Sequence, residues 1–287
     1  GNKQTDGVGP HGEILMEYGV YDAVRAGFDK VVFIIKPEMQ ELMERLCGNM
    51  ASRLHTADGR PVKVCYAYQD NSSLPEWYAP PAGRTKPFGT AHAVLCTRDI
   101  VHEPFCVINA DDFYGADAYR TMYAALQTMP AQGAAAMVGY LLKNTVTAHG
   151  TVSRGVCHVK DGYLSDIRET LKIALLPDGT IRDEDAGAVL APDTVVSMNF
   201  WGFTPWIYQA LEDYFRQFLR SEAGQSVKAE CLLPTMVGDM LAQGRLTVSV
   251  LQSADRWFGM TYQEDRARVA QELVRLHEAG AYPAELR

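Results

Sequence analysis

The first half of the chain alternates between two hydrophobic periods. Helix-like spacing of apolar residues occurs over residues 17–27, 37–49, 91–100 and 116–128. Nearly continuous apolar runs that predict buried strands lie at 30–36, 62–68, 105–110 and 134–142. Strands separated by helices predict βαβ units. We therefore expect an α/β fold with a mostly parallel, doubly wound, Rossmann-like sheet covered by helices on both faces.

The second half has a different pattern. Segments 151–159 and 163–168 flank Lys160-Asp161-Gly162, and an Asp-Gly pair between two strands predicts a β-hairpin. Residues 195–203 predict a further strand, 205–219 a long helix, 246–251 a last strand and 263–279 a C-terminal helix. This order predicts a β-rich insertion in the second half of a single domain.

Composition and charge narrow the class of protein. The 287 residues are 47% hydrophobic with a net charge of −8, so the chain has no global basic field to attract nucleic acid or a membrane surface. No apolar run approaches the ~18 residues needed to span a bilayer, and we expect no signal peptide. The cysteines are scattered without a CxxC pair, which predicts reduced thiols in a cytoplasmic protein. They are Cys47, Cys65, Cys96, Cys106, Cys157 and Cys231. The oligomeric state stays open, with a homo-oligomer among the alternatives.

The run FCVINADDFYG, residues 105–115, ends a buried strand in two acids, Asp111 and Asp112. Ligands of doubly wound sheets bind outside the carboxyl ends of the strands. Mg²⁺ binds one or two carboxylates together with water and phosphate oxygens. The acids therefore predict a metal site, with capping of the helix that begins near Ala116 as the alternative.

Two glycine-rich stretches are weaker candidates. Gly89 and Thr90 precede a helix, where a glycine turn lets backbone amides approach an anion or a base edge, although such turns are also common for structural reasons. Lys3 lies in the polar opening GNKQTDGVGPHGE, where a lysine is either solvated surface or part of a phosphate loop.

Three polar residues of the second half complete the candidates. Glu169 and Lys172 follow the predicted hairpin strand and form either an exposed ion pair or ligand contacts. Asn199 interrupts the apolar strand VVSMNFWGF and needs hydrogen-bond partners from the protein or a ligand.

Taken in order, these segments resemble the nucleotidyltransferases that make NDP-sugars. Lys3 lies where that family has the lysine that ends its glycine-rich signature loop, and residues 86–91 resemble its nucleobase-binding turn. Asn109-Ala110-Asp111-Asp112 resembles its metal site, in which the first aspartate holds Mg²⁺. Further positions fall where sugar and sugar-phosphate contacts are expected. They are Gly150, Glu169, Lys172 and Asn199.

The sequence departs from the family pattern at several positions. The signature loop and the strand before it are missing upstream of Lys3, which we attribute to truncation or disorder. Lys86 replaces a glutamine that many members have before the proline. Thr261 stands where an aspartate or asparagine often supplies a second metal ligand, and Glu230 is the alternative acid.

The resemblance implies a GT-A-type sheet, with a nucleotide-binding half at 1–145, an acceptor-binding half at 146–260 and a C-terminal helix at 261–287. It implies Mg²⁺-dependent transfer of a nucleotidyl group from an NTP to a phosphorylated small molecule, with release of pyrophosphate. Asp111 would hold Mg²⁺, with Asp112 supporting it or capping the helix, and Lys3 and Lys172 would neutralise the phosphates. Lys86, Gly89, Thr90 and Asn109 would bind the nucleotide. A GT-A glycosyltransferase and a catalytically degenerate regulatory domain are the alternatives.

Overall fold

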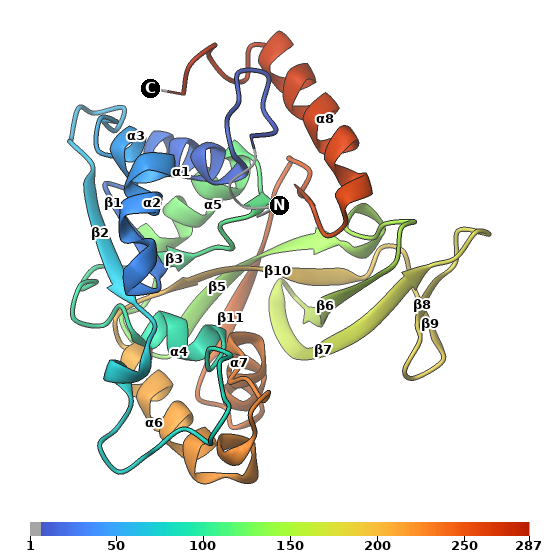
Figure 1. Cartoon of the computed structure of the whole chain (residues 1–287). Helices are drawn as coiled ribbons and strands as arrows, with labels where there is room; N and C mark the ends of the chain where they lie inside the picture. Colours follow the sequence, from blue (N-terminus) through green and yellow to red (C-terminus); the bar gives the residue numbers. More distant parts are fainter. Residues whose placement is uncertain (1–6, 287) are drawn as a thin grey trace.

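The computed structural model describes residues 7–286 (Figure 1). Its helices are α1 (Leu15–Ala26), α2 (Gln40–Met43), α3 (Asn49–Ala51), α4 (Thr90–Leu95), α5 (Ala116–Gln127), α6 (Ile207–Arg220), α7 (Leu233–Ala242) and α8 (Arg266–Glu278). Its strands are β1 (Lys30–Ile35), β2 (Lys63–Tyr68), β3 (Phe105–Val107), β4 (Asp112–Phe113), β5 (Ala134–Leu141), β6 (Thr151–Lys160), β7 (Tyr163–Leu175), β8 (Ile181–Asp183), β9 (Ala188–Leu190), β10 (Val195–Phe203), β11 (Thr247–Gln252) and β12 (Phe258–Gly259).

The sheets are mixed, and the prediction of a mostly parallel sheet is wrong. Strands β1 and β2 form a parallel pair, and β5 and β11 form another. Within residues 7–286 every other pairing is antiparallel. The main reason is β10, which runs antiparallel to β3, β5 and β6. An apolar run indicates that both faces of a strand are buried, but it does not encode the direction of the neighbouring strand.

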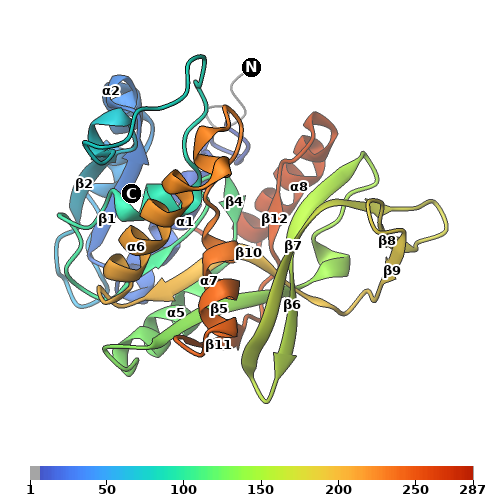
Figure 2. The ribbon, with the colours of Figure 1, turned by 90° about the horizontal axis from the view of Figure 1, so that it is seen from below.

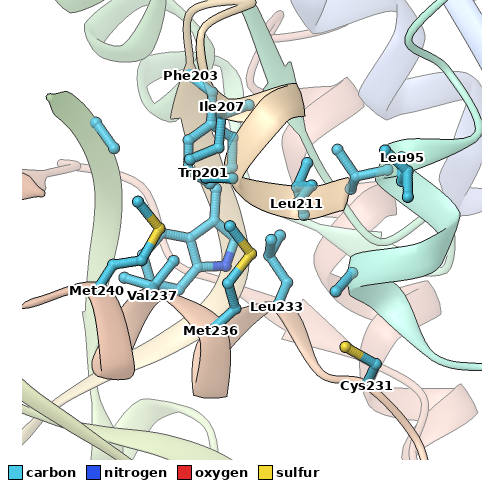
Figure 3. Packing of buried hydrophobic residues seen from close by; sticks show 14 of the residues in the cluster. Leu95, Trp201, Phe203, Ile207, Leu211, Cys231, Leu233, Met236, Val237 and Met240 are labelled. Carbon is cyan, nitrogen blue, oxygen red and sulfur yellow. The ribbon is translucent and has the colours of Figure 1, made fainter. Parts of the chain in front are cut away.

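Helices cover both faces of the central sheet, as predicted. On one face α5 packs with β5 and β10 around Met122, Val138 and Phe200. On the other face α6 and α7 pack around Trp201, whose indole is surrounded by methionine and valine side chains of α7 (Figure 3). Figure 2 shows α6 and α7 crossing this second face, while β8 and β9 project beyond it. The long strand β10 therefore contributes to both cores.

Local structure follows the sequence more closely than topology does. The hairpin is confirmed, with Asp161 and Gly162 both at positive φ between β6 and β7. The predicted helix over 37–49 is irregular, because a π-helical turn at Glu44–Gly48 separates α2 from α3. Helix α7 and the short strands β4, β8 and β9 were not predicted.

The segment after α8 folds back onto the first helix. Tyr282 and Leu286 are buried together with Leu15 and Tyr18 of α1. The Tyr282 hydroxyl donates a 2.6 Å hydrogen bond to Asp22, which is 1% exposed. The end of the described chain is therefore part of the core that supports α1.

Two sequence expectations can be compared with the fold. All six cysteines are free thiols, as predicted. Among residues 7–286, no helix is both long enough and apolar enough to cross a lipid bilayer.

Candidate active site

Several of the site candidates lie where β1, β2 and β3 end. The Lys30 ammonium, at the start of β1, donates to the Ile100 carbonyl at 3.1 Å and pairs with Glu103 at 2.5 Å, just before β3 begins. Strands β1 and β3 therefore start at the same edge and run in the same direction. Since β2 is parallel to β1, all three strands end at the opposite edge. Asn109–Asp112 follows β3 at that edge.

A cavity of about 490 Å³ opens at the ends of β1 and β2. Residues directly after the two strands line it, with Lys36 following β1 and Gln69 following β2. The segment 84–88 forms the opposite wall. A volume of this size fits a nucleoside-sized ligand.

The side-chain amide of Gln69 is held in one orientation inside this cavity. Its Nε2 donates to the Gly89 carbonyl at 2.9 Å and lies 3.3 Å from His92 Nδ1. His92 is 1% exposed and stacks on Phe215, and burial lowers its pKa to about 4, so the ring is neutral. The His92 Nε2 lies 2.8 Å from the Ser73 hydroxyl oxygen, a distance that fits a hydrogen bond donated by Nε2–H. In this tautomer the His92 Nδ1 carries no proton and accepts from Gln69. Both N–H groups of the Gln69 amide thus face protein acceptors, and no group within residues 7–286 donates to its side-chain oxygen.

Gly89 and Thr90 are fixed by the chain segment before α7. A Cβ at Gly89 would lie 2.6 Å from the Cys231 carbonyl oxygen, and its φ of +100° is strained for any other residue. The Thr90 hydroxyl accepts from the Leu233 amide at 2.9 Å. Neither residue lines the cavity, whereas Lys86 does. The contacts of Gly89 and Thr90 therefore fit the alternative in which this turn holds the fold together rather than contacting a ligand.

Asp111 and Asp112 have different surroundings. Asp112 accepts from Asn109 Nδ2 at 3.0 Å and from the Tyr114 hydroxyl at 3.3 Å. Burial and the neighbouring Asp111 carboxylate raise the pKa of Asp112 to about 7. Asp111 is exposed and makes no hydrogen bond or ion pair with the rest of the described chain. Of the two acids, Asp111 is the one left to bind a ligand.

Asp112 does not cap α5, so that part of the prediction is wrong. The N-cap residue of α5 is Gly115, which has no side chain to accept a hydrogen bond from the first helical amides. Instead the Asp117 amide donates to Asp255 at 2.8 Å. Asp255 lies far along the chain, and sequence spacing gave no signal for this contact.

Asn199 joins β10 to the end of β3. Its Nδ2 donates to the side-chain oxygen Oδ1 of Asn109 at 2.9 Å. Its own side-chain oxygen Oδ1 accepts from the Trp201 indole N–H at 3.0 Å. A bulge between Ser197 and Trp201 places Asn199 at φ +62°. The expectation that this buried-strand amide needs partners is confirmed, and both partners are protein groups.

The alternatives for a second metal ligand lie in different surroundings. Strand β12 pairs with β4, with Gly259 opposite Asp112, and Thr261 follows two residues later. The Glu230 carboxylate is 2.7 Å from the Lys86 ammonium, beside the cavity. Within residues 7–286 no three His, Cys, Asp or Glu side chains form a metal-binding group. The register thus brings Thr261, rather than Glu230, toward the acids.

Glu169 and Lys172 both lie on β7. Glu169 accepts from the Ser153 hydroxyl at 2.7 Å, and Lys172 pairs with Asp185 at 3.0 Å. Three residues of β7 span a two-residue step of β6 at this point, so the strand is bulged between them. Because a bulge interrupts the alternation of side chains, the odd spacing of Glu169 and Lys172 no longer forces them onto opposite faces.

Gly150 lies next to the segment that follows β12. A Cβ at this glycine would lie 2.4 Å from the Tyr262 hydroxyl oxygen, and that hydroxyl donates to the Thr151 carbonyl at 2.6 Å. Gly150 therefore allows Tyr262 to join the start of β6 to the chain after β12.

Arg154 is a further candidate site residue that the sequence analysis missed. It is 8% exposed, and its guanidinium donates to the carbonyl oxygens of Thr145 and Ser153. Burial lowers its pKa to about 10, while the charges of Asp112 and Glu169 act in the opposite direction. Arg154 is therefore close enough to interact electrostatically with both Asp112 and Glu169. A lone arginine inside the strand pattern of 151–160 is the signal that could have identified it. Lys3 lies outside the described residues.

Comparisons with solved structures show which proteins share this fold. A solved UDP-glucose pyrophosphorylase complexed with UDP-glucose matches with a TM-score of 0.58 and 15% identity, over 95% of this chain and 90% of that one. A putative glucose-1-phosphate thymidylyltransferase from Bacillus anthracis matches with a TM-score of 0.60 and 13% identity, over 95% and 87%. An inositol-1-phosphate CTP transferase from T. maritima matches with a TM-score of 0.55 and 12% identity, over 92% and 83%. These likenesses show a shared fold.

No curated protein matches the sequence. The family model described as nucleotidyl transferase matches residues 8–169, which is more than half of the chain. This match confirms the family resemblance and favours nucleotidyl transfer over the glycosyltransferase alternative. The chain belongs to the nucleotidyl transferase family.

Proposed function

We propose that the protein transfers a nucleotidyl group from an NTP to a phosphorylated small molecule, a sugar 1-phosphate, and releases pyrophosphate. The family assignment supports the reaction type. Two of the structural neighbours, a UDP-glucose pyrophosphorylase and a putative glucose-1-phosphate thymidylyltransferase, support a sugar 1-phosphate as the acceptor. The third neighbour is named for a different phosphorylated small molecule, inositol 1-phosphate. The products would be an NDP-sugar and pyrophosphate.

One observation carries this proposal. The exposed Asp111 carboxylate and the cavity containing Gln69 lie at the same edge of the molecule, where parallel strands end. A nucleotide whose nucleoside occupies the cavity would direct its phosphates along this edge toward Asp111. Ligands of such sheets bind outside the carboxyl ends of the strands.

The cavity walls suggest how the nucleotide is held. The fixed Gln69 carbonyl oxygen would accept a hydrogen bond from an N–H group of the base, because both N–H groups of its amide already face protein acceptors. Lys36 and Lys86 line the same cavity and would attract the phosphates. Lys86 would do so in competition with Glu230, its present partner.

The residues present fit one Mg²⁺ ion held mainly by substrate. Asp111 offers a carboxylate that no described residue occupies, and Mg²⁺ is commonly bound by one or two carboxylates plus phosphate oxygens and water. Bound there, the ion would neutralise negative charge on the phosphates during transfer. Asn109 and Tyr114 hold Asp112 in place beside it.

The transfer itself needs little proton chemistry. A phosphate oxygen of the acceptor would attack the α-phosphorus, forming a new P–O bond while the bond to the bridging oxygen breaks and pyrophosphate leaves. Positioning and charge neutralisation then dominate catalysis. Lys172 would leave Asp185 to bind the incoming phosphate, and Glu169 would hold acceptor hydroxyls. Lys3 would neutralise the triphosphate.

A panel of NTPs against acceptors tests this function by pyrophosphate detection. The acceptors are glucose 1-phosphate, inositol 1-phosphate and a small phosphonate, with Mg²⁺ present. Pyrophosphate from one NTP with glucose 1-phosphate supports the proposal. Pyrophosphate only with another acceptor would contradict the sugar assignment while keeping nucleotidyl transfer. No pyrophosphate with any pair, while an NTP still binds, would favour the degenerate regulatory domain.

A further inference from the structure

Arg84 lines the cavity that contains Gln69, and its positive charge has no carboxylate partner within residues 7–286. The half-buried guanidinium donates to three backbone carbonyl oxygens instead. They belong to Ser226 at 2.7 Å, Ala229 at 2.7 Å and Pro87 at 2.9 Å. Charged groups that leave water usually have a partner of opposite charge or another group that stabilises the charge. A ligand of the cavity can supply that stabilisation.

Phe88 covers one face of the Arg84 guanidinium plane. The guanidinium carbon Cζ lies 3.9 Å from the centre of the Phe88 ring, which is a cation–π contact. Phe88 is 3% exposed and meets the ring of Phe215 edge-on, with the ring centroids 5.9 Å apart. The Phe88 ring therefore fixes the tilt of the guanidinium plane, and the three carbonyl oxygens fix its position.

Most of the guanidinium edge is occupied as well. Nη1 donates to one of the three carbonyl oxygens and Nη2 to the other two, while Nε is buried and has no hydrogen-bond partner within residues 7–286. Because one face and most of the edge are covered, the second face of the plane is the surface that Arg84 presents to the cavity. A flat cation presented in this way matches the π-face of a nucleobase.

We propose that Arg84 is the platform on which the nucleobase stacks. The inference rests on the proposed function in one respect, that the ligand of this cavity is a nucleotide. Every base has a π-face, so stacking on Arg84 strengthens the binding of all NTPs alike. The side-chain oxygen of Gln69 accepts from an N–H group of the base, and the position of that group differs from one base to another. Arg84 therefore sets the affinity for the base, and Gln69 selects which base binds.

Lys86 lies two residues away and has a different role. Its ammonium is 2.7 Å from the Glu230 carboxylate, and it offers a compact charge to phosphates rather than a flat surface. Substitution of Arg84 by lysine keeps the positive charge and removes the plane. The variant Arg84→Lys therefore separates stacking from charge neutralisation.

Isothermal titration of the chain with each common NTP tests the stacking role. Tripolyphosphate is titrated in parallel, because it carries the phosphate charge without a base. The matched control variant is Tyr78→Phe. The Tyr78 hydroxyl donates to the Gly224 carbonyl at 2.5 Å, so it joins the loop of Arg84 to the same chain segment that holds Ser226. Tyr78 does not line the cavity, and the variant keeps its ring.

Arg84→Lys is expected to raise the dissociation constants of all NTPs that bind by a similar factor of about tenfold or more, the usual effect of losing one stacked base. The dissociation constant of tripolyphosphate should stay unchanged, and Tyr78→Phe should change neither constant. An equal rise for tripolyphosphate would show that Arg84 neutralises phosphates. An equal rise in the two variants would show that Arg84 only holds the cavity wall. Either result would overturn the stacking role.

Pyrophosphate detection with the same proteins separates this inference from the proposed function. Weaker NTP binding by Arg84→Lys, in a chain that releases no pyrophosphate with any acceptor, would support stacking and contradict nucleotidyl transfer. Pyrophosphate release together with unchanged NTP affinity in the variant would support transfer and overturn stacking. A wild-type chain that binds no NTP would overturn both.

Discussion

The side-chain amides of Asn109 and Asn199 are hydrogen-bonded to each other at 2.9 Å across 90 positions of sequence. This bond connects the end of β3 to the bulge of β10, and through Asn109 it reaches the Asp112 carboxylate. The position of the Asp112 carboxylate therefore depends on a strand from the second half of the chain.

Asn199 has two separable roles, in hydrogen bonding and in backbone conformation. Replacing it with glycine removes the bonds to Asn109 and Trp201 but permits its φ of +62°. We expect Asn199→Gly to lower the free energy of unfolding by about 1–3 kcal/mol. Asn199→Ala should lose about 1–2 kcal/mol more, because it also strains the left-handed backbone. Urea denaturation measures both, and equal losses would contradict the backbone role.

Asp111 is expected to act in catalysis and not in folding. Asp111→Ala should reduce pyrophosphate release at least about 100-fold, the usual cost of removing a group that stabilises transition-state charge. The melting temperature should stay unchanged, since this carboxylate has no partner among the described residues. Asp99→Ala, at another exposed aspartate without a described partner, is the control and should retain turnover. Near-wild-type turnover in the Asp111 variant would refute the metal-site assignment.

Gln69 should determine nucleotide affinity. Gln69→Leu removes the carbonyl oxygen that faces the cavity, and we expect the NTP dissociation constant to rise about tenfold or more, the cost of one unpaired polar group. Isothermal titration with the NTP selected in the activity panel measures this change. Gln252→Leu, at an exposed glutamine outside the cavity lining, is the control. An unchanged dissociation constant for the Gln69 variant would place the base elsewhere.

The close approach of the Cys231 backbone is expected to require a glycine at position 89. Gly89→Ala combines a φ of +100° with a Cβ 2.6 Å from a carbonyl oxygen. Gly179→Ala is a matched control, because its φ of +85° is similar but its Cβ would meet open space. We expect the Gly89 variant to lose about 1–3 kcal/mol more than the control, the usual cost of overpacking. Similar losses in the two variants would show that the close approach is unimportant.

Asp22 should make stability depend on pH. Burial raises its pKa from 3.8 to about 7, so between about pH 4 and 7 the folded state binds more protons than the unfolded state. The free energy of unfolding should therefore fall as pH rises through this window and level off above it. Asp22→Asn should reduce that slope by up to about 1 kcal/mol per pH unit. Denaturation of both proteins from pH 5 to 8 compares the slopes, and identical slopes would show that Asp22 does not titrate there.

Local elements were predictable wherever neighbouring residues determine them. The helix that Gly27 ends is α1, and the run 195–203 is β10. The Asp161-Gly162 turn formed as expected because both residues tolerate positive φ. Asn199 was recognisable as a buried polar residue that needs partners, although the sequence did not identify those partners.

The sequence by itself determined most of the longer helices and strands, the family and the acids that follow β3. Tertiary structure alone decided the antiparallel direction of β10, the Asn109–Asn199 bond and the capping of α5 by Asp255. It also decided that Asp111 stays exposed while Asn109 and Tyr114 hold Asp112. The physical reason is the distance along the sequence over which each interaction acts. Periodicity and turn chemistry act over a few residues, whereas strand direction and the burial of a carboxylate depend on segments distant in the sequence that meet only in the folded chain.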